Sequence, residues 1–511
     1  MQTKAKLPRL LSALIFCGAI GSAASLESNP ANAFGGGFGR MGGFGGMGGF
    51  RGAPAYGAMR GPPAYGALRG PMRPYPGHVV GGRPIGGDRN FPKEPRHPIV
   101  GTGGPPVLGP PLSAQPPASA SGASGSGVPP RGEQRFVADE IVTEISGGAT
   151  AQAIESIARR YNLTRLESIN LPLIGSMVYR WRVAGRRSVA DIVGSIEDQH
   201  AVIASAQPNY VFRLQEDAAA KDPPRSGDDA AQYVLGKLQI DQAHHLATGK
   251  DVAIAVIDSD IDAKHPDLAG TAMKRFDALG DEQAPQQHGT AMAGAIAAHG
   301  KLSGVALGPK LLAARAFDDT PGAARGTSFA IYKSLQWAAD NSARVVNMSF
   351  AGPPDPLLHR MLTAAYDKGM VLIAAAGNAG PNSAPLYPAA DADVIAVTAT
   401  DMSDGIYKMA NRGQFIAVAA PGVDVLALAP GESYQLTTGT SVAAAEVSGI
   451  AALLLELKPS LTPADVRTIL MTSAKPMSAG GQQNDSGAGL ANAFRAVNSL
   501  NGKSVAPRAG E

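Results

Sequence analysis

Short apolar runs alternate with longer amphipathic segments from about Asp228 onward, and this alternation is the strongest constraint on how the chain can fold. It predicts an α/β fold over residues 228–498, with a doubly wound, largely parallel sheet covered by helices on both faces. Functional residues of such sheets gather beyond the carboxyl ends of the strands. The expected strands are Val252–Ile257, Leu311–Ala316, Val345–Ser349, Val371–Ala376, Val394–Thr398 and Ile416–Ala419; the expected helices are Gly289–Ala298, Ser328–Asn341, Leu357–Lys368, Val442–Leu457 and Pro463–Thr472.

Residues 134–215 have an ordinary globular composition and a different order of elements. Alternating or extended segments predict strands at Phe136–Ile145, Met177–Val183 and Val202–Leu214. Helical spacing of apolar residues appears in Ala149–Leu163 and again in residues 188–199. The resulting βαββαβ-like order predicts a small two-layer α+β domain.

The first 33 residues are typical of an export signal. Basic residues at Lys4, Lys6 and Arg9 precede the apolar segment Leu10–Ala24, and Ala31–Ala33 fits the A-x-A cleavage pattern. Cleavage before Phe34 is expected, with a site near Ala24 as the alternative. The apolar segment holds about fifteen residues, fewer than the roughly twenty of a membrane-spanning helix. An uncleaved anchor is the remaining alternative.

The only cysteine of the chain, Cys17, lies in this apolar segment. Phe16 before it is too bulky for a lipoprotein cleavage site, so we expect no lipid attachment. Once residues 1–33 are removed, no thiol remains. A disulfide, a cysteine nucleophile and a cysteine-ligated metal are then all excluded.

Residues 34–133 are of low complexity and contain much of the chain's 63 Gly and 40 Pro. A nine-residue repeat starts at Arg51 and Arg60, with a decayed copy from Arg69. Few large apolar side chains are available to offset the entropy of ordering, so we expect disorder. A solvated spacer is the first interpretation. The alternative is binding of a surface or cell-wall polymer through Arg, Gly and Tyr, and the third and least favoured interpretation is binding of nucleic acid.

The net charge of +3 divides unevenly along the chain. Residues 1–33 carry +2 and residues 34–133 carry +7, which leaves −6 for the remainder. A basic N-terminal region therefore precedes an acidic globular part.

Three segments at strand–helix junctions contain residues that can act together in catalysis. VAIAVIDSDID places Asp258 at the end of an apolar strand, and QHGTAMAGAIAA places His288 at the start of a helix. TTGTSVAAAEVSG places Ser441 at the start of another helix. A serine hydroxyl needs a base to become a nucleophile, an imidazole can be that base, and a carboxylate can orient the imidazole. The backbone N–H of Ser441, unpaired at a helix start, could also face a developing oxyanion.

A fourth segment, VLIAAAGNAGP, ends an expected buried strand close to Asn378. Its side-chain amide could donate a second hydrogen bond to an oxyanion. Each of the four segments alone has an ordinary structural interpretation, such as a turn, a cap or a buried histidine. Their combination at the expected kind of junction favours a shared site.

With these residues in view, residues 228–498 resemble the subtilisin-like serine proteases, the subtilase family. The order Asp, His, Asn, Ser matches the family, with spacings of 30, 90 and 63 residues. The resemblance implies that Asp258 orients, His288 acts as general base and acid, and Ser441 is the nucleophile. It implies Asn378 as oxyanion donor. VVNMSFAG is similar to the family's substrate-binding strand, which places Ser349 and Gly352 beside the bound peptide, and the loop through Gly322 and Gly326 resembles the opposite wall.

The resemblance also implies that residues 134–215 are a propeptide that acts as intramolecular chaperone and inhibitor. Val211–Leu214 would then lie product-like in the active cleft, paired by strand addition. Autoprocessing is expected somewhere in Arg213–Asp228. Residues 216–227 are the processing linker and residues 499–511 a tail.

The chain departs from the family pattern outside the triad. The family usually has Gly at the position of Asp260 and a His or similar residue at Ala291; it has Met, Pro and His at Val442, Ala445 and Glu446. Asp260 could change the charge of the cleft, and Glu446 is interpreted as structural rather than as a second acid. The other histidines lack paired-His or Cys spacing, so no catalytic metal is assigned; these are His244, His245, His265, His299 and His359.

The resulting hypothesis is a secreted serine endopeptidase made as an autoprocessed zymogen. It needs no cofactor for catalysis, although a structural calcium ion is possible. Expected partners are polypeptide substrates and its own propeptide; no nucleic acid, no membrane span after signal cleavage and a monomeric state are expected. Its location is periplasm, cell surface or medium. The alternatives are a catalytically inactive binding or scaffold protein of the same fold, and a surface-attachment protein that works through the Gly/Arg/Tyr-rich segment.

Overall fold

The computed structural model describes residues 126–215, 232–281, 283–318, 325–477 and 483–500. All of them belong to one compact unit that spans residues 108–511. Within it, residues 126–215 are called the N-terminal subdomain and residues 232–500 the C-terminal subdomain. The expected signal segment, the processing linker and nearly all of residues 34–133 lie outside the described residues, as does Gly322.

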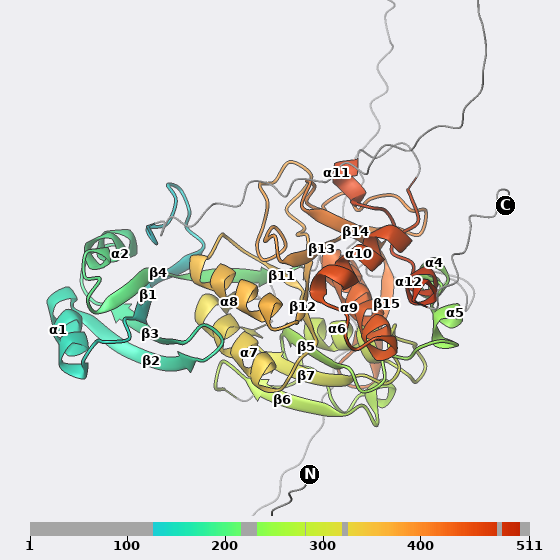
Figure 1. The fold of residues 1–511 in the computed structure, drawn as a ribbon, viewed down its shortest axis with the longest axis horizontal. Helices are drawn as coiled ribbons and strands as arrows, with labels where there is room; N and C mark the ends of the chain where they lie inside the picture. The colour runs from blue at the N-terminus through green and yellow to red at the C-terminus, as the bar shows by residue number, and fades with distance from the viewer. Residues whose placement is uncertain (1–125, 216–231, 282, 319–324, 478–482, 501–511) are drawn as a thin grey trace, which may run out of the picture. The chain divides into compact units, whose positions relative to one another are not determined.

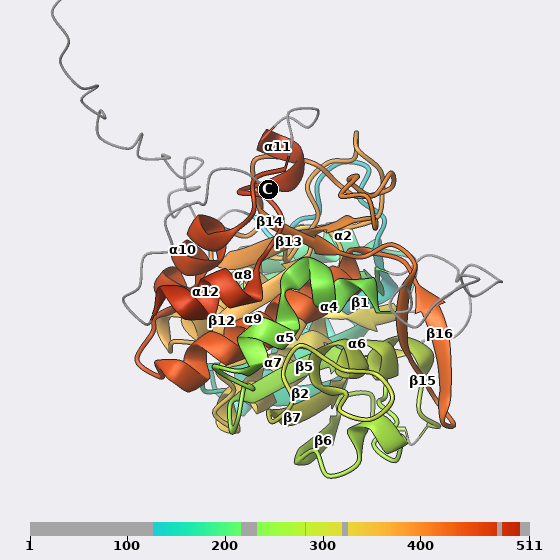
Figure 2. The same cartoon turned by 90° about the vertical axis from the view of Figure 1, so that its right-hand side faces the viewer.

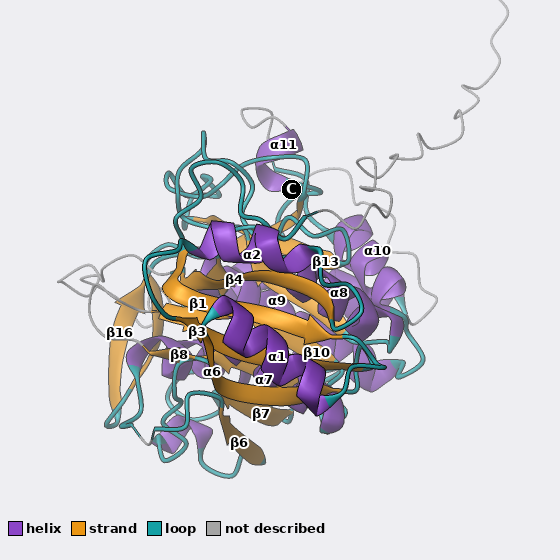
Figure 3. Ribbon diagram, turned by 90° about the vertical axis from the view of Figure 1, so that its left-hand side faces the viewer, coloured by secondary structure: helices purple, strands orange, loops and turns teal. Residues whose placement is uncertain are grey.

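The N-terminal subdomain has the order β-α-β-β-α-β, with two helices on one face of an antiparallel sheet (Figure 3). Thr150 and Ser188 begin the helices, because their hydroxyls accept the backbone N–H of Ala153 and Asp191. The order of strands and helices is the expected one, although the sequence pattern predicted a range for β3 and none for β2. The elements are β1 (Phe136–Ile145), α1 (Ala151–Tyr161), β2 (Leu163–Leu171), β3 (Ser176–Val183), α2 (Val189–Glu197) and β4 (Ile203–Leu214).

The C-terminal subdomain is built on a seven-stranded parallel sheet, which confirms the α/β prediction for this part of the chain (Figure 1). The strand order is β14-β13-β12-β10-β5-β7-β6. From β5 the chain passes to the edge strand β6, returns to β7 beside β5, and then crosses to β10 and winds outward through β12, β13 and β14. The switch in direction lies between β5 and β10. The strands are β5 (Ala253–Asp258), β6 (Met273–Asp277), β7 (Lys310–Arg315), β10 (Val345–Met348), β12 (Val371–Ala375), β13 (Val394–Thr400) and β14 (Ile416–Pro421).

Helices cover both faces of this sheet. Ile254 and Val256 of β5 pack in one apolar core with α6 and α9, whereas Ala255 and Ile257 pack in a second core with α7 and α8. Adjacent strand residues thus face opposite cores, as a pleated strand requires. The helices are α6 (Gln287–Ala297), α7 (Ser328–Asp340), α8 (Pro356–Asp367), α9 (Thr440–Leu457), α10 (Pro463–Ser473) and α12 (Ala493–Ser499).

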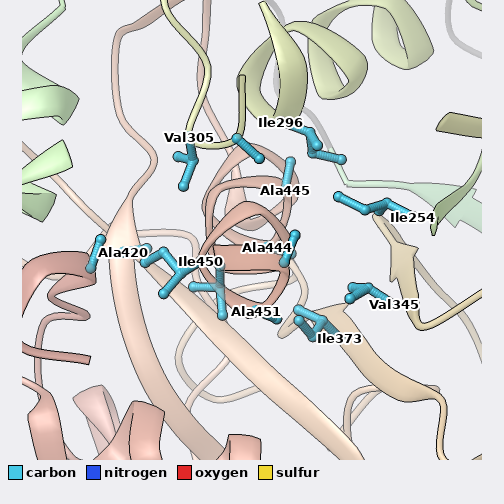
Figure 4. Close-up of a cluster of buried hydrophobic side chains, with 14 of the residues drawn as sticks. Ile254, Ile296, Val305, Val345, Ile373, Ala420, Ala444, Ala445, Ile450 and Ala451 are labelled. Carbon is cyan, nitrogen blue, oxygen red and sulfur yellow. The ribbon is translucent and has the colours of Figure 1, made fainter. Parts of the chain in front are cut away.

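Helix α9 lies at the centre of the first core. Figure 4 shows its residues Ala444, Ala445 and Ile450 among side chains from the sheet and from neighbouring segments, including Ile254 and Val305. Among the described helices it alone is long and apolar enough to cross a membrane, but 89% of it is buried inside the protein. It is therefore a core helix of this fold.

Several short elements were not expected from the sequence. They lie at the edge of the sheet, in a separate hairpin, or in segments whose structure depends on distant partners (Figure 2). These elements are α4 (Tyr233–Leu238), α5 (Ile240–His244), η1 (Pro266–Leu268), β8 (Phe317–Asp318), β9 (Arg325–Thr327), β11 (Phe350–Ala351), the hairpin of β15 (Val425–Ala429) and β16 (Ser433–Thr437), and α11 (Gln483–Ser486), together with β6 and α12, whose bounds are given above.

Strand β4 joins the two subdomains. Its first half pairs with β1 inside the N-terminal subdomain. Its second half pairs antiparallel with β9 on one side and with β11 on the other, both in the C-terminal subdomain. One strand thus belongs to the small sheet and to the wall of the larger subdomain.

Candidate active site

The expected acid lies at the carboxyl end of a central strand. Asp258 is the last residue of β5 and is fully buried. Its Oδ1 accepts hydrogen bonds from the backbone N–H of Ser259, at 2.7 Å, and from His288 Nδ1, also at 2.7 Å. The carboxylate is thus oriented by its own loop as well as by the imidazole.

The imidazole of His288 bridges the carboxylate and the serine. His288 is the second residue of α6, fully buried, and its Nε2 lies 3.1 Å from Ser441 Oγ. The next residue, Gly289, allows the helix to start this close to β5, since a Cβ there would be 2.3 Å from the carbonyl oxygen of Ser259. The three residue types expected to act together are in hydrogen-bond contact, in the series carboxylate, imidazole, hydroxyl.

Ser441 is held from two sides at the start of α9. It is the second residue of that helix, 1% exposed, and its Oγ lies 3.0 Å from the carbonyl oxygen of Ser349. The Ser349 hydroxyl in turn donates to the carbonyl oxygen of Ser441, at 3.1 Å. Ser349 therefore positions the serine backbone and also lines the site.

The side-chain amide of Asn378 has a fixed orientation. Its Oδ1 accepts the backbone N–H of Thr440, at 3.1 Å, and the Thr440 hydroxyl, at 2.9 Å. With the oxygen occupied in this way, the Nδ2 group must point in the other direction. It donates to the carbonyl oxygen of Gln215, at 3.0 Å.

The same carbonyl oxygen of Gln215 lies 2.6 Å from Ser441 Oγ. The backbone N–H of Gln215 donates to the carbonyl of Ser349, and its side-chain oxygen accepts the backbone N–H of Asn378. Gly439 makes this approach possible, because a Cβ there would be 2.4 Å from the Gln215 oxygen. The sequence placed Val211–Leu214 in the cleft but did not identify Gln215 as the residue at the reactive atoms.

The strand that leads to Gln215 lies between two walls. Phe212 pairs with Gly326 of β9, and Leu214 pairs with Phe350 of β11. Gly352 leaves room for the Phe212 ring, since a Cβ at Gly352 would lie 2.3 Å from it. The two expected walls therefore lie on opposite sides of this strand.

The residues that depart from the expected family pattern differ in their contacts and in their surroundings. Both carboxylate oxygens of Asp260 are 2.6 Å from Arg275 Nη2, so the additional charge is paired. Val442 and Ala445 are fully buried in the core. Glu446 is buried as well, and this burial raises the pKa of its carboxyl well above 4.5.

The remaining histidines make local contacts with the fold. His244, His265 and His299 each lie within hydrogen-bond distance of a backbone carbonyl oxygen, and His359 Nδ1 is 2.6 Å from Asp391. Among the residues that the structure describes, no group of three or more His, Cys, Asp or Glu could hold a metal ion. A calcium site stays a prediction.

Comparison with known proteins gives one consistent result. A sequence profile described as the Subtilase family matches residues 249–494. Thermitase from Thermoactinomyces vulgaris is 34% identical over 274 residues, which cover 52% of this chain and 95% of thermitase. Subtilisin E from Bacillus subtilis (strain 168) is 34% identical over 289 residues, covering 54% of this chain and 74% of subtilisin E.

A solved structure extends the similarity beyond the C-terminal subdomain. The crystal structure of fervidolysin from Fervidobacterium pennivorans, titled a keratinolytic enzyme related to subtilisin, matches with a TM-score of 0.61 and 25% sequence identity. The match covers 71% of this chain and 61% of that chain. It therefore includes more of this protein than the sequence profile does.

Proposed function

Since this chain belongs to the subtilase family and is a serine endopeptidase, we propose that it hydrolyses peptide bonds through an acyl-enzyme on Ser441. His288 accepts the Ser441 proton on Nε2 as Oγ attacks the substrate carbonyl, and then delivers that proton to the leaving amine. Asp258 holds the ring in the required tautomer and stabilises the imidazolium. The contacts of 2.7 and 3.1 Å along this series support these roles.

Asn378 Nδ2 and the backbone N–H of Ser441 are the proposed oxyanion donors. The amide is preorganised, because Thr440 fixes its oxygen before any substrate binds. Donors fixed in advance stabilise a developing negative charge without reorganisation in the transition state. Ser349 and Gly352 are the proposed substrate-binding residues, since the chain that occupies the cleft contacts both.

The observation that carries the proposal is the position of Gln215. Its carbonyl oxygen contacts both the nucleophile and the oxyanion donor, as a substrate's scissile carbonyl would. We therefore assign the bond between Gln215 and Glu216 as the site of autoprocessing. Ser441 Oγ would bond to the Gln215 carbonyl carbon, the amide nitrogen of Glu216 would leave with a proton from His288, and water would then release the Gln215 carboxylate.

On this proposal the protein is a zymogen whose residues 134–215 inhibit it and assist its folding. The test is the mass of the N-terminal fragment released on maturation, which should end at Gln215. The fragment is a better reporter than the mature enzyme, because further trimming within residues 216–231 would change only the mature N-terminus. Ser441→Ala should remain uncut. A fragment ending elsewhere, or cutting of Ser441→Ala by itself, would overturn the assignment.

Catalytic competence has an independent test. The mature protein should react with a fluorophosphonate, and Ser441→Ala should not. Asn378→Ala should label more slowly and lower kcat by about 100- to 1000-fold, a range transferred from an enzyme of this same family. Absence of labelling in the mature wild type would favour an inactive scaffold.

Export, surface retention and cofactor independence are also proposals. The signal expected in residues 1–33 lies outside the described residues, and its deletion should leave the protein inside the cell. Deletion of residues 34–133 should leave surface retention unchanged if the segment is a spacer, and abolish it if the segment is an anchor. Chelation should not change the initial rate, whereas a lower melting temperature in chelator would reveal a structural calcium ion.

A further inference from the structure

Helix α9 contains two glutamates with opposite surroundings. Glu456, near its end, accepts the backbone N–H groups of Thr248, Gly249 and Lys250. Glu446, near its start, is 1% exposed, and neither of its carboxyl oxygens has a hydrogen-bond partner among the described residues. A buried polar group without a partner is rare in folded proteins and calls for an explanation.

Glu446 is one of the residues that line a small cavity. The centre of a water molecule can occupy about 20 Å³ of it, and one water requires roughly 10–15 Å³ by that measure. Its walls are mostly apolar, with side chains such as Val305 and Leu428. The two polar side chains in the wall belong to Gln232 and Ser303, and Gln232 uses both ends of its amide on the Ser303 backbone.

No cationic side chain among the described residues of the surrounding elements pairs with Glu446. On α4, Lys237 is paired with Asp404 at 2.6 Å, and the Tyr233 hydroxyl donates to the carbonyl of Val423. Other titratable groups on or beside the cavity elements also have contacts elsewhere. His244 lies within hydrogen-bond distance of the Val305 carbonyl oxygen, and the Lys301 ammonium lies over the Tyr434 ring. Asp424 accepts a hydrogen bond from Thr438, and His288, at the far end of α6, contacts Asp258.

A carboxylate in this position would be a buried charge with neither a counter-ion nor a donor from the described residues. Desolvation therefore favours the neutral acid, which is why burial raises the pKa of Glu446 well above 4.5. Two oxygens alone are too few for a calcium ion, which takes six to eight oxygen ligands. A proton and one water satisfy the carboxyl within the space available.

We propose that Glu446 is a neutral carboxylic acid that binds one water in this cavity, and that its ionisation as the pH rises loosens the packing of α9. The location gives this step a consequence for the enzyme. Glu446 lies five residues after Ser441 on the same helix. Gly294 and Ala295 of α6, the helix that carries His288, line the same cavity. Entry of water to hydrate a carboxylate would separate the two helices that position the catalytic residues.

The direction of the pH dependence follows from the raised pKa. In the unfolded chain Glu446 ionises near 4.5, whereas in the folded protein it stays protonated to higher pH. The stability contributed by the neutral acid is fully present below pH 4.5 and is lost as the pH rises toward and through the folded pKa. Within that window the folding equilibrium constant falls by up to tenfold per pH unit.

The test compares Ser441→Ala full-length protein, which cannot digest itself, with and without Glu446→Gln. The folding equilibrium constant of each protein is measured by urea unfolding between pH 5 and 10. The constant of the Glu446→Gln protein divided by that of its parent should increase with pH, by up to tenfold per pH unit. The matched control is Glu432→Gln, which removes a carboxylate from an exposed position and should leave the ratio constant. A constant ratio for Glu446→Gln as well would overturn the proposal.

Two further measurements keep the outcome decisive. Infrared spectra at pH 5, just above the pKa of an unburied glutamate, should show the carbonyl stretch of a neutral carboxylic acid that is absent from Glu446→Gln; its absence from the parent protein contradicts the proposal. If Glu446→Gln does not fold, Glu446→Met supplies an uncharged side chain of similar length for the same comparison. A dependence of alkaline stability on whether the salt is sodium, potassium or choline, lost in the variant, would instead identify a metal cation as the occupant.

Discussion

The two subdomains differ in how their sheets are covered. The parallel sheet of the C-terminal subdomain has helices of its own on both faces. The small sheet of the N-terminal subdomain has α1 and α2 on one face only, with Ile141 in that core. Its other face, represented by Val142, packs on α7 and α8 of the C-terminal subdomain. One subdomain is complete by itself, whereas the other has an apolar face that only its neighbour covers.

The junction between them also contains buried polar contacts. Asp355 accepts hydrogen bonds from Gln207 of β4, from the hydroxyls of Tyr332 and Ser328, and from the N–H of Leu358 at the start of α8. Glu144 of β1 pairs with Arg360 of α8. Apolar burial thus defines each core, while directional hydrogen bonds fix how the N-terminal subdomain docks. The chain's two tryptophans separate these effects, since Trp181 lies in the N-terminal core and Trp337 in α7.

The largest expected effect comes from Phe212→Ala in the strand that joins the subdomains. Phe212 is fully buried, and its ring lies 5.8 Å from that of Phe350 in an edge-to-face arrangement. We expect a loss of about 3–5 kcal/mol, as for other buried phenylalanines. The loss should be measured by urea unfolding of protein that carries Ser441→Ala and Trp337→Phe, with the fluorescence of Trp181 as the signal.

The control for that variant is Ile192→Ala, in the N-terminal subdomain's own core. It should lower Trp181-detected stability by about 2–5 kcal/mol without altering the cleft contacts. If Phe212→Ala left the Trp181-detected stability unchanged while Ile192→Ala lowered it, the joining strand would not be an energetic link between the subdomains.

Asp355→Ala should have the next largest effect, about 2–3 kcal/mol, because it leaves several buried donors without an acceptor. About 1 kcal/mol of this belongs to α8, whose first turn Asp355 caps, and should appear in Trp337 fluorescence. Three of the four donors belong to the C-terminal subdomain itself, so the loss at Trp181 should be that of the Gln207 contact. An unchanged transition at Trp181 would mean that the residue stabilises the C-terminal subdomain rather than the junction.

Arg360→Met should have the smallest effect, about 1 kcal/mol, because the arginine is nearly half exposed. Burial opposes ionisation of Glu144, but hydrogen bonds from Arg360 and Ser176 outweigh it and lower the pKa of Glu144 below 4.5. The stabilisation is therefore present above pH 4.5 and is lost as the pH falls through that lowered pKa. The free energy of unfolding, measured by Trp181 fluorescence between pH 7 and 3, should become the same for the two proteins in acid. A difference that stays constant with pH would contradict the ion pair.

Patterns local in the sequence predicted much of this fold. The six strands expected for the parallel sheet and the five expected helices all occur, with ends that differ from expectation by at most two residues. Apolar runs such as Val371–Ala375 indicate buried strands directly. The positions of Ser441 and His288 at strand–helix junctions mark both as candidate catalytic residues. Among the elements missed, β9 and β11 are three and two residues long. They are strands only through pairing with distant segments, β11 with β4 and β9 with β4 and β8.

Contacts between distant residues were the part that could not be predicted. Gln215 carries no sequence signal for its contact with Ser441, 226 residues away, because that contact depends on where β4 ends between its two walls. Glu446 did carry a signal, a charged residue on an apolar helix, and its burial agrees with a structural interpretation. The missing partner for its carboxyl could be recognised only once the surrounding elements were placed.

The double membership of β4 has a consequence for kinetics. Its pairings with β9 and β11 do not involve the bond after Gln215, so scission of that bond would leave every one of them intact. On the proposed autoprocessing, scission would take place within one molecule, so its rate should not change with protein concentration. Release of the fragment would be a separate dissociation step, which depends on affinity and dilution. A freshly cut enzyme would therefore stay inhibited in a one-to-one complex with its fragment until the fragment dissociates.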